Sequence, residues 1–231
     1  SKYKKSIKET SGAHKIAVLI AEGEIVDGKG GNDGSITDGG MAEAISAIRK
    51  DKRIEAVVLR INSPGGSALA SDMIWQNISL LASEKPVYVS MGNVAASGGY
   101  YIAAPCKKIY ASPMTITGSI GVFGLMFSAE ELMHNKLGIK TQQVGTHPLS
   151  NLIAIDKGPS KEVLAVLQNN VNHTYDRFKT VVSEGRQIDL LKVDSLAKGH
   201  VYSGNDALEI GLIDEFGGLL DVIEDVQATL D

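Results

Sequence analysis

Short apolar runs that alternate with helical segments constrain this chain more than any other feature. Such runs cover 15–20, 55–62 and 86–91, each too short for a helix and rich in Val and Ile. Between them, residues 41–49 and 68–82 repeat apolar side chains at helical spacing. Strands that alternate with helices favour right-handed β-α-β crossovers and a mainly parallel sheet. The chain is therefore predicted to have an α/β fold.

The same alternation continues to the C-terminus. A glycine-rich loop fills 27–40, and a small-residue turn at 93–105 runs into a helix. The remaining predicted elements are strands at 107–112 and 139–144, and helices at 128–137, 160–185, 189–198, 204–210 and 217–230. No internal repeat is visible, so residues 15–231 are predicted to form a single domain. The polar, lysine-rich residues 1–14 are interpreted as a linker or the start of a cut piece.

Charge and cysteine content exclude several classes of protein. A formal net charge of −4 provides no basic surface for nucleic acid, so no nucleic-acid partner is expected. The single cysteine, Cys106, excludes an internal disulfide and a Cys-rich metal site, and is interpreted as a small packed residue. We expect neither a cofactor nor a metal. No apolar run reaches the length of a membrane-spanning helix, so membrane contact would require a segment absent from this chain.

The strongest candidate for chemistry is Ser97, in the segment NVAASGGYYIA. It follows a predicted strand, opens a predicted helix and has only Ala and Gly as neighbours, which leaves its Oγ open to a substrate. This arrangement resembles the nucleophile elbow of α/β-hydrolases, although the spacing is not G-x-S-x-G. The alternative is a close helix contact through small residues. The segment by itself fits both interpretations.

Two further glycine-rich turns accompany Ser97. Gly65 and Gly66 follow one buried strand and precede a helix, so their N–H groups and that of Gly98 can bind an oxyanion together. Ser119, in the segment TGSIG, has a hydroxyl that could orient a catalytic base. Each segment alone also fits an ordinary tight turn. Their joint occurrence points to one site.

Together these segments resemble the signal peptide peptidase A (protease IV) family of the ClpP/crotonase superfamily. The matching segments are RINSPGGS (60–67), VSMGNVAASGGYYIA (89–103), SPMTITGSIGVFG (112–124) and GHVYSGNDALEIGLIDEFGG (199–218). The resemblance covers nearly the whole chain from about residue 15. It implies a ClpP/crotonase-like repeated β-β-α superhelix with a mainly parallel sheet flanked by helices.

The resemblance also implies a mechanism. Ser97 would be the nucleophile of a Ser/Lys dyad, in which a neutral lysine with a pKa lowered by burial takes the serine proton. Ser119 would hydrogen-bond that lysine, and Gly98 with the Gly65–Gly66 turn would form the oxyanion hole. The implied activity is that of a serine endopeptidase degrading apolar peptides, such as cleaved signal peptides, at the bacterial inner membrane. Its catalytic domain would face the periplasm or the outside.

The family pattern breaks at the general base. In short members the lysine lies in a loop downstream of the serine, and that position falls here on or beside Ser150. No lysine occupies 145–156, and the nearest one downstream is Lys157. Long members carry two tandem copies of the fold, of which the first provides the lysine and the second the serine. We therefore expect the base to come from the N-terminal half or another copy of the fold, in a homo-oligomer.

Other interpretations stay open at this point. A histidine base would most plausibly be His147, since packing or surface roles fit the remaining histidines, which are His14, His134, His173 and His200. Without a base, the chain could be an inert assembly or scaffold domain. A crotonase-like acyl-thioester enzyme is a further alternative, although that chemistry needs no serine nucleophile. The apolar run at 122–127 fits core packing, and alternatively a substrate groove or an assembly contact.

Overall fold

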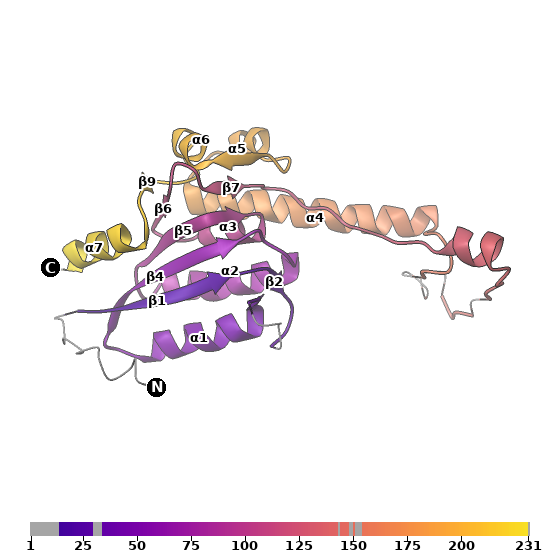
Figure 1. Ribbon diagram of the computed structural model, residues 1–231, viewed down its shortest axis with the longest axis horizontal. Coiled ribbons are helices and arrows are strands. Elements are labelled where there is room, and N and C mark those ends of the chain that lie inside the picture. Colours follow the sequence, from indigo (N-terminus) through magenta and orange to yellow (C-terminus); the bar gives the residue numbers. More distant parts are fainter. Residues whose placement is uncertain (1–13, 30–33, 143, 148–149, 151–153, 231) are drawn as a thin grey trace. The chain divides into compact units, whose positions relative to one another are not determined.

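Figure 1 shows the computed structural model of the chain, which describes residues 14–29, 34–142, 144–147, 150 and 154–230. Its contacts divide the chain into two compact units. The first, here called the sheet unit, consists of Ser1–Gly121 and Phe178–Asp231. The second, the inserted unit, is Val122–Arg177. The range predicted as one domain thus contains two units of contact.

A mainly parallel sheet forms the centre of the sheet unit (Figure 1). Strands β1, β4, β5, β6 and β9 follow one another in this order, each parallel to its neighbour. β7 is parallel to β5 and antiparallel to β8, while β2 and β3 form a separate small sheet. The strands are β1 Lys15–Glu22, β2 Ile25–Val26, β3 Ile36–Thr37, β4 Ile54–Ser63, β5 Val87–Ala96, β6 Lys108–Ala111, β7 Ile116–Gly118, β8 Val201–Ser203 and β9 Glu215–Phe216.

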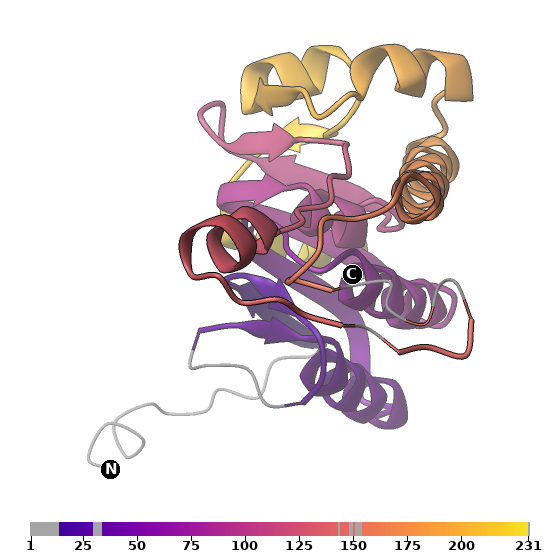
Figure 2. The same cartoon turned by 90° about the vertical axis from the view of Figure 1, so that its right-hand side faces the viewer.

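Helices connect these strands, as the alternating pattern predicts. Figure 2 shows α1 and α2 lying along one side of the sheet unit. The helices are α1 Asp38–Lys50, α2 Ala68–Ala82, α3 Gly98–Ala103, α4 Lys161–Arg186, α5 Leu190–Leu196, α6 Gly204–Glu209 and α7 Leu219–Leu230, together with the short π-helix η2 Leu132–Lys136. Side-chain caps begin several of them; the Thr37 hydroxyl, for example, accepts from the Gly40 N–H at the start of α1. Within the described residues, none of these helices combines the length and apolar character needed to cross a membrane.

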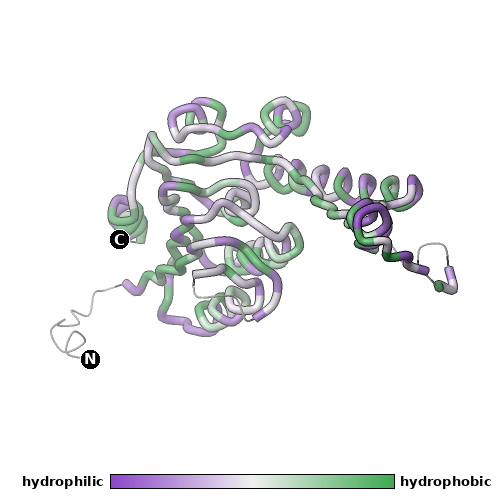
Figure 3. Tube along the Cα trace, turned by 45° about the vertical axis from the view of Figure 1, so that its right-hand side comes forward, coloured by the Kyte–Doolittle hydropathy of each residue, from purple (hydrophilic) through white to green (hydrophobic). Residues whose placement is uncertain are grey.

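The centre of the sheet is buried because β4 and β5 are apolar on both faces, whereas β1 leaves Val18 and Ile20 exposed. On one face, Val58 of β4 and Tyr88 of β5 pack with Val222 and Val226 of α7. The opposite face of β4, including Leu59, is fully buried too. Figure 3 shows green and purple alternating along the helices, which turn an apolar side inward. Burial of this apolar area supplies the main stabilisation of the unit.

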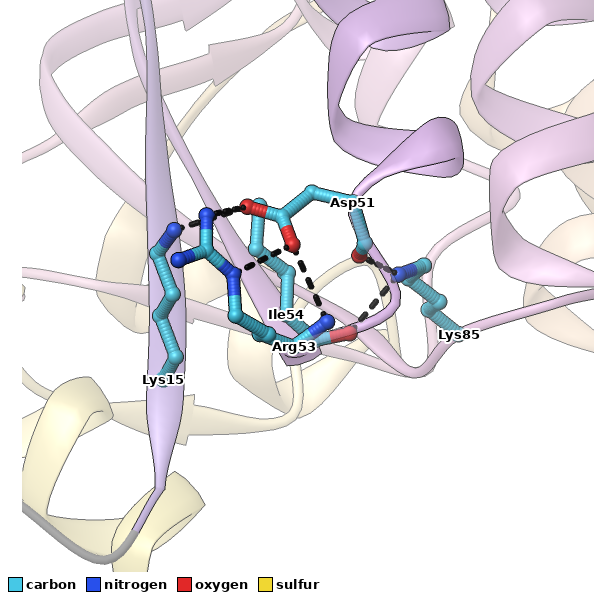
Figure 4. A network of polar contacts seen from close by, with 5 residues as sticks. All are labelled: Lys15, Asp51, Arg53, Ile54 and Lys85. Carbon is cyan, nitrogen blue, oxygen red and sulfur yellow. Dashed lines mark hydrogen bonds and ion pairs between the residues drawn. The ribbon is translucent and has the colours of Figure 1, made fainter.

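A polar network ties the start of the sheet together (Figure 4). The Asp51 carboxylate accepts from the Arg53 guanidinium at 2.9 and 3.0 Å and from the Lys15 ammonium at 2.8 Å. Hydrogen bonds from Arg53 and then from Lys15 hold the pKa of Asp51 well below its usual range. The buried Lys85 ammonium donates to the carbonyls of Asp51 and Ile54, both at 2.7 Å. The network therefore joins α1, β1 and β4 to the segment before β5.

The inserted unit differs most from the predicted elements. The predicted strand at 139–144 is absent from its described residues, 139–142 and 144, and the helix predicted at 128–137 is reduced to the η2 turn. The apolar run at 122–127 is extended and exposed, with 88% of Phe123, 71% of Leu125 and 75% of Phe127 accessible. Core packing was the wrong expectation for this run, because α4 lies beside it yet leaves these three side chains mostly exposed.

A pocket of about 950 Å³ lies in the inserted unit. The apolar run and the first half of α4 form most of its wall. Its apolar lining residues are Val122, Phe123, Leu125, Met126, Phe127, Ile155, Val163, Leu164, Leu167 and Val171. The unit thus presents an apolar surface of the kind that marks a binding or assembly site.

Candidate active site

Ser97 lies between β5 and α3, at the strand–turn–helix junction that the sequence predicts. Its backbone angles are φ 53° and ψ −121°, a conformation that costs a non-glycine residue about 1–3 kcal/mol. Three hydrogen bonds hold it there. The Ser97 N–H donates to the Gly118 carbonyl at 2.9 Å, and the Ser97 carbonyl accepts from Tyr100 and Tyr101 at 3.0 and 2.9 Å. These bonds hold the half-buried serine in its strained conformation at a sharp turn, as in a nucleophile elbow.

The glycine turn after β4 lies directly against Ser97. A Cβ atom on Gly65 would lie 2.6 Å from the Gly98 nitrogen and 2.8 Å from the Ser97 Cβ. Gly65 also has a φ of +99°, in the region that favours glycine. Only glycine therefore fits at position 65. The structure brings Gly65, Gly98 and Ser97 together from two different strand ends.

Gly66 is held from its other side by β2. The Ile25 N–H donates to the Gly65 carbonyl at 2.9 Å, and the Ile25 carbonyl accepts from the Ser67 N–H at 2.8 Å. A Cβ atom on Gly66 would lie 2.1 Å from the Ile25 carbonyl oxygen. The Ser67 hydroxyl donates to Asp27 at 2.7 Å and caps α2. These contacts leave the turn little freedom.

The three N–H groups predicted for an oxyanion hole differ in their partners. The Gly65 N–H donates to the Ser63 Oγ at 3.1 Å. In the part of the chain that the structure describes, the N–H groups of Gly66 and Gly98 make no hydrogen bond. Two neighbouring donors are therefore available to an incoming oxyanion.

Ser119 directly follows β7, whose last residue is hydrogen-bonded to the backbone of Ser97. Its predecessor Gly118 accepts the Ser97 N–H, and Ser119 itself has a φ of 50°. The Ser119 N–H donates to the His200 carbonyl at 2.7 Å. The sequence predicts only a packing or surface role for His200, which lies in the matching segment GHVYSG. The structure gives its backbone a supporting role and packs its ring against Tyr202, with centroids 4.5 Å apart.

The candidate bases from the sequence lie in the inserted unit. The Ser150 N–H donates to the His147 carbonyl, and the Ser150 Oγ accepts from the His147 N–H, both at 3.0 Å. These bonds form a local turn at the position where the family lysine would fall. Lys157 lines the pocket of the same unit. The units are described separately, so neither Lys157 nor His147 is placed near Ser97.

Cys106 is a free, buried cysteine that the structure gives no catalytic role. Burial raises the pKa of its thiol to about 12, which keeps it protonated, consistent with a packed residue. No group of three His, Cys, Asp or Glu side chains among the described residues could hold a metal ion. The geometry around Ser97 thus offers a hydroxyl and backbone donors, the components of acyl transfer.

Comparison with known proteins agrees with this geometry. The family model described as "Peptidase family S49" matches residues 79–231, and that described as "Clp protease" matches residues 12–120. The chain belongs to peptidase family S49. The predicted signal peptide peptidase A resemblance is confirmed, and the prediction of a serine peptidase is confirmed at the level of the family.

Members of peptidase family S49 align over most of the chain. Protease 4 of Salmonella typhi is 42% identical over 211 residues, which cover 90% of this chain and 33% of that protein. A putative signal peptide peptidase SppA of Enterococcus faecium is 38% identical over 186 residues, covering 79% of this chain and 53% of that protein. The chain therefore spans about a third of the first relative and about half of the second.

A solved structure supports the fold. A ClpP1 mutant from Listeria monocytogenes matches with a TM-score of 0.60 and 15% identity, covering 88% of this chain and 92% of that one. At this identity the match shows the fold alone. The predicted ClpP-like α/β fold, with a mainly parallel sheet flanked by helices, is confirmed for this member of peptidase family S49.

Proposed function

We propose that this chain carries the nucleophile of a Ser/Lys-dyad endopeptidase that cleaves apolar peptides. The observation that carries the proposal is the strained Ser97 at a strand–turn–helix junction, in contact with a glycine turn whose Gly66 N–H is unbonded. Family membership supports the same reading. The names of the relatives, Protease 4 and signal peptide peptidase, support peptide substrates such as cleaved signal peptides.

In the proposed reaction the Ser97 Oγ attacks the carbonyl carbon of the scissile peptide bond. A C–O bond forms, the carbonyl π electrons move to oxygen, and the serine proton passes to a neutral lysine. The N–H groups of Gly66 and Gly98 bind the oxyanion, with the Gly65–Gly66 turn as their frame. Collapse breaks the C–N bond, the lysine returns the proton to the leaving amine, and water then hydrolyses the acyl-serine. Ser119 orients the lysine.

The lysine is proposed to come from another copy of the fold, since none occupies 145–156. Catalysis would then depend on assembly, and a homo-oligomer or a preceding half of the protein is the expected partner. We further propose the bacterial inner membrane as the place of action, with the catalytic domain facing the periplasm or the outside. The apolar character of signal peptides supports this location.

A fluorophosphonate probe tests the proposal, because it reacts only with an activated serine. The Ser97 Oγ–P bond forms, fluoride leaves, and the base takes the serine proton. We expect labelling of Ser97, identified by mass spectrometry, to be weak in this chain alone and strong when a lysine-bearing copy of the fold precedes it. Ser97→Ala should abolish it. Equal labelling with and without that copy would point to a local base such as His147, and no labelling in either form would refute the peptidase.

An inert assembly domain is the remaining alternative, and a specific observation favours it. No lysine occupies 145–156, where the family base is expected, and a pocket lined by exposed apolar side chains offers an assembly surface. An unreactive Ser97 in every form of the protein, together with a stable oligomer, would support this alternative. The crotonase-like enzyme has no such observation in its favour.

A further inference from the structure

Ser63 is a fully buried polar residue that the mechanism above does not use. It ends β4, none of its surface is exposed, and its Oγ accepts a hydrogen bond from the Gly65 N–H at 3.1 Å. A serine that accepts from the N–H two residues later closes a tight local turn. The turn so closed is the one that presents the Gly66 N–H.

Ser63 also touches the segment that follows Ser97. A Cβ atom on Gly99 would lie 2.7 Å from the Ser63 carbonyl oxygen and 3.3 Å from the Ser63 Cβ. The backbone of Ser63 therefore packs against the start of α3 while its hydroxyl holds the glycine turn. A single residue connects the two segments that supply the oxyanion donors.

The Ser63 hydroxyl occupies the Gly65 N–H and so determines which glycine N–H is available to an oxyanion. The Gly65 N–H is buried and satisfied by Ser63, whereas Gly66 is exposed and no residue that the structure describes accepts from its N–H. If the Ser63 Oγ were absent, the Gly65 N–H would be a buried donor without an acceptor, which proteins avoid. The peptide plane would turn to find another acceptor, and the neighbouring Gly66 N–H would move with it.

We propose that Ser63 is a positioning residue, which fixes the Gly65 peptide so that the Gly66 and Gly98 N–H groups point to one oxyanion. This inference rests on the proposed function. Serine suits the position because it combines an acceptor with a small volume. Alanine lacks the acceptor, and because Ser63 is fully buried a larger polar side chain would have to displace its neighbours.

The test measures the rate of fluorophosphonate labelling of Ser97 at increasing probe concentration. It uses whichever form reacts faster as wild type, this chain alone or this chain preceded by a lysine-bearing copy of the fold. Attack on phosphorus places negative charge on an oxygen in the oxyanion hole. Ser63→Ala should therefore lower the maximal labelling rate by about tenfold or more, because loss of an oxyanion donor costs about 10²–10³. The half-saturating probe concentration should stay unchanged. Ser63→Cys, with a weak acceptor of similar size, should fall between the two.

Ser90→Ala is the matched control. Ser90 is also a fully buried serine, on β5, and its hydroxyl accepts from Arg60 at 2.9 Å outside both turns. Loss of its hydroxyl should reduce the melting temperature and leave the maximal labelling rate within about twofold, since it contacts neither turn. Amide exchange of Gly65, measured by NMR, should become faster in Ser63→Ala and stay slow in Ser90→Ala.

Equal maximal rates for the wild type and Ser63→Ala would overturn the inference. So would an equal loss of rate in Ser90→Ala, or unchanged exchange at Gly65. A wild-type protein that does not react in any form refutes the proposed function, and this inference with it. That failure appears before any Ser63 variant is compared, so the two failures are distinguishable.

Discussion

At the scale of single residues, the site requires glycines, which have no Cβ atom. The Gly65, Gly66 and Gly98 positions each lie where a Cβ atom would collide with a neighbour. At Gly98 the collision is with the Ser71 Oγ at 2.4 Å and the Ile25 Cδ1 at 3.2 Å. Small residues beside Ser97 therefore do more than leave room for substrate. They let two backbone turns approach closely enough to share one ligand.

Gly98→Ala tests this close approach. The added methyl group must displace Ser71 or move the Gly98 N–H, so we expect fluorophosphonate labelling of Ser97 to slow by about 10²-fold, as for loss of an oxyanion donor. Gly218→Ala is the control, because a Cβ atom there, at the start of α7, would make an ordinary contact, 3.5 Å from the Asp221 Oδ2. Labelling of Gly98→Ala at the wild-type rate would argue against a shared oxyanion site.

At the scale of elements, the ends of parallel strands set the site. β4 delivers the glycine turn and β5 delivers Ser97, and the two strands are hydrogen-bonded neighbours. β7 then joins β5 through the Ala96–Gly118 pair and brings Ser119 to the same edge. At the other end of the strands, where β1 and β4 begin, Asp51 hydrogen-bonds to Lys15, Arg53 and Lys85. Chemistry and anchoring thus occupy opposite ends of the strands.

Asp51→Asn should destabilise the sheet unit in a pH-dependent way. The pKa of Asp51 is lowered in the folded state, chiefly by Arg53, so its ionised form stabilises the fold above its unfolded pKa of about 3.9. This stabilisation should be fully present at pH 7 and decline as the pH falls below about 4. The variant should therefore melt below the wild type at pH 7, with a difference that shrinks in acid.

Thermal unfolding followed by circular dichroism at several pH values provides the measurement. The control is Glu209→Gln, which removes an exposed carboxylate at the end of α6 and should leave the melting temperature unchanged. A difference between Asp51→Asn and the wild type that stays constant down to pH 2 would contradict the role of the ionised carboxylate.

At the scale of the whole molecule, two units carry two kinds of surface. The sheet unit contains the buried core and the Ser97 region. The inserted unit contains the apolar pocket and exposes Phe123, Leu125 and Phe127. Exposed apolar patches on this scale usually mark interaction sites. The proposed supply of a lysine by another copy of the fold requires such a contact surface somewhere on the chain.

We expect the chain to self-associate through the apolar run, and the triple variant Phe123→Ser, Leu125→Ser and Phe127→Ser to shift it toward the monomer. Analytical ultracentrifugation at several concentrations measures the shift. A triple substitution of exposed polar residues of the sheet unit, Asn205→Ser, Glu224→Ser and Gln227→Ser, is the control. An unchanged oligomer in the apolar variant, or a monomeric wild type at every concentration, would contradict this assignment.

Much of the fold was predictable because it depends on local pattern. α2 begins and ends at the predicted residues, 68–82, and α4 differs from its prediction, 160–185, by one residue at each end. The short strands β2, β3, β7, β8 and β9 were not predicted as strands, and β3 lies in the predicted loop 27–40, since two or three residues carry no period of their own. They exist because a distant segment pairs with them: β7 and β9 pair with the longer β5 and β6, β8 pairs with β7, and β2 pairs with β3. The strand predicted at 139–144 fails for the opposite reason, because no neighbouring strand pairs with its described residues.

The candidate site divides in the same way. Ser97, Gly65, Gly66, Gly98 and Ser119 were all selected from the sequence, because small residues after apolar runs mark sharp turns at strand ends. The bond from Gly65 to Ser63, the support of Gly66 by Ile25 and the contact of His200 with Ser119 were not. Each joins residues through hydrogen bonds or close packing that no periodicity encodes.

The sequence by itself determined the alternating α/β pattern, the family resemblance and the serine that stands at a strand end. It did so because strand and helix periods and glycine turns are properties of neighbours along the chain. Only the tertiary structure decided which N–H groups are free and that the apolar run at 122–127 is exposed. These depend on which backbone groups meet across the sheet, and pairing between distant segments exists only once the chain has folded.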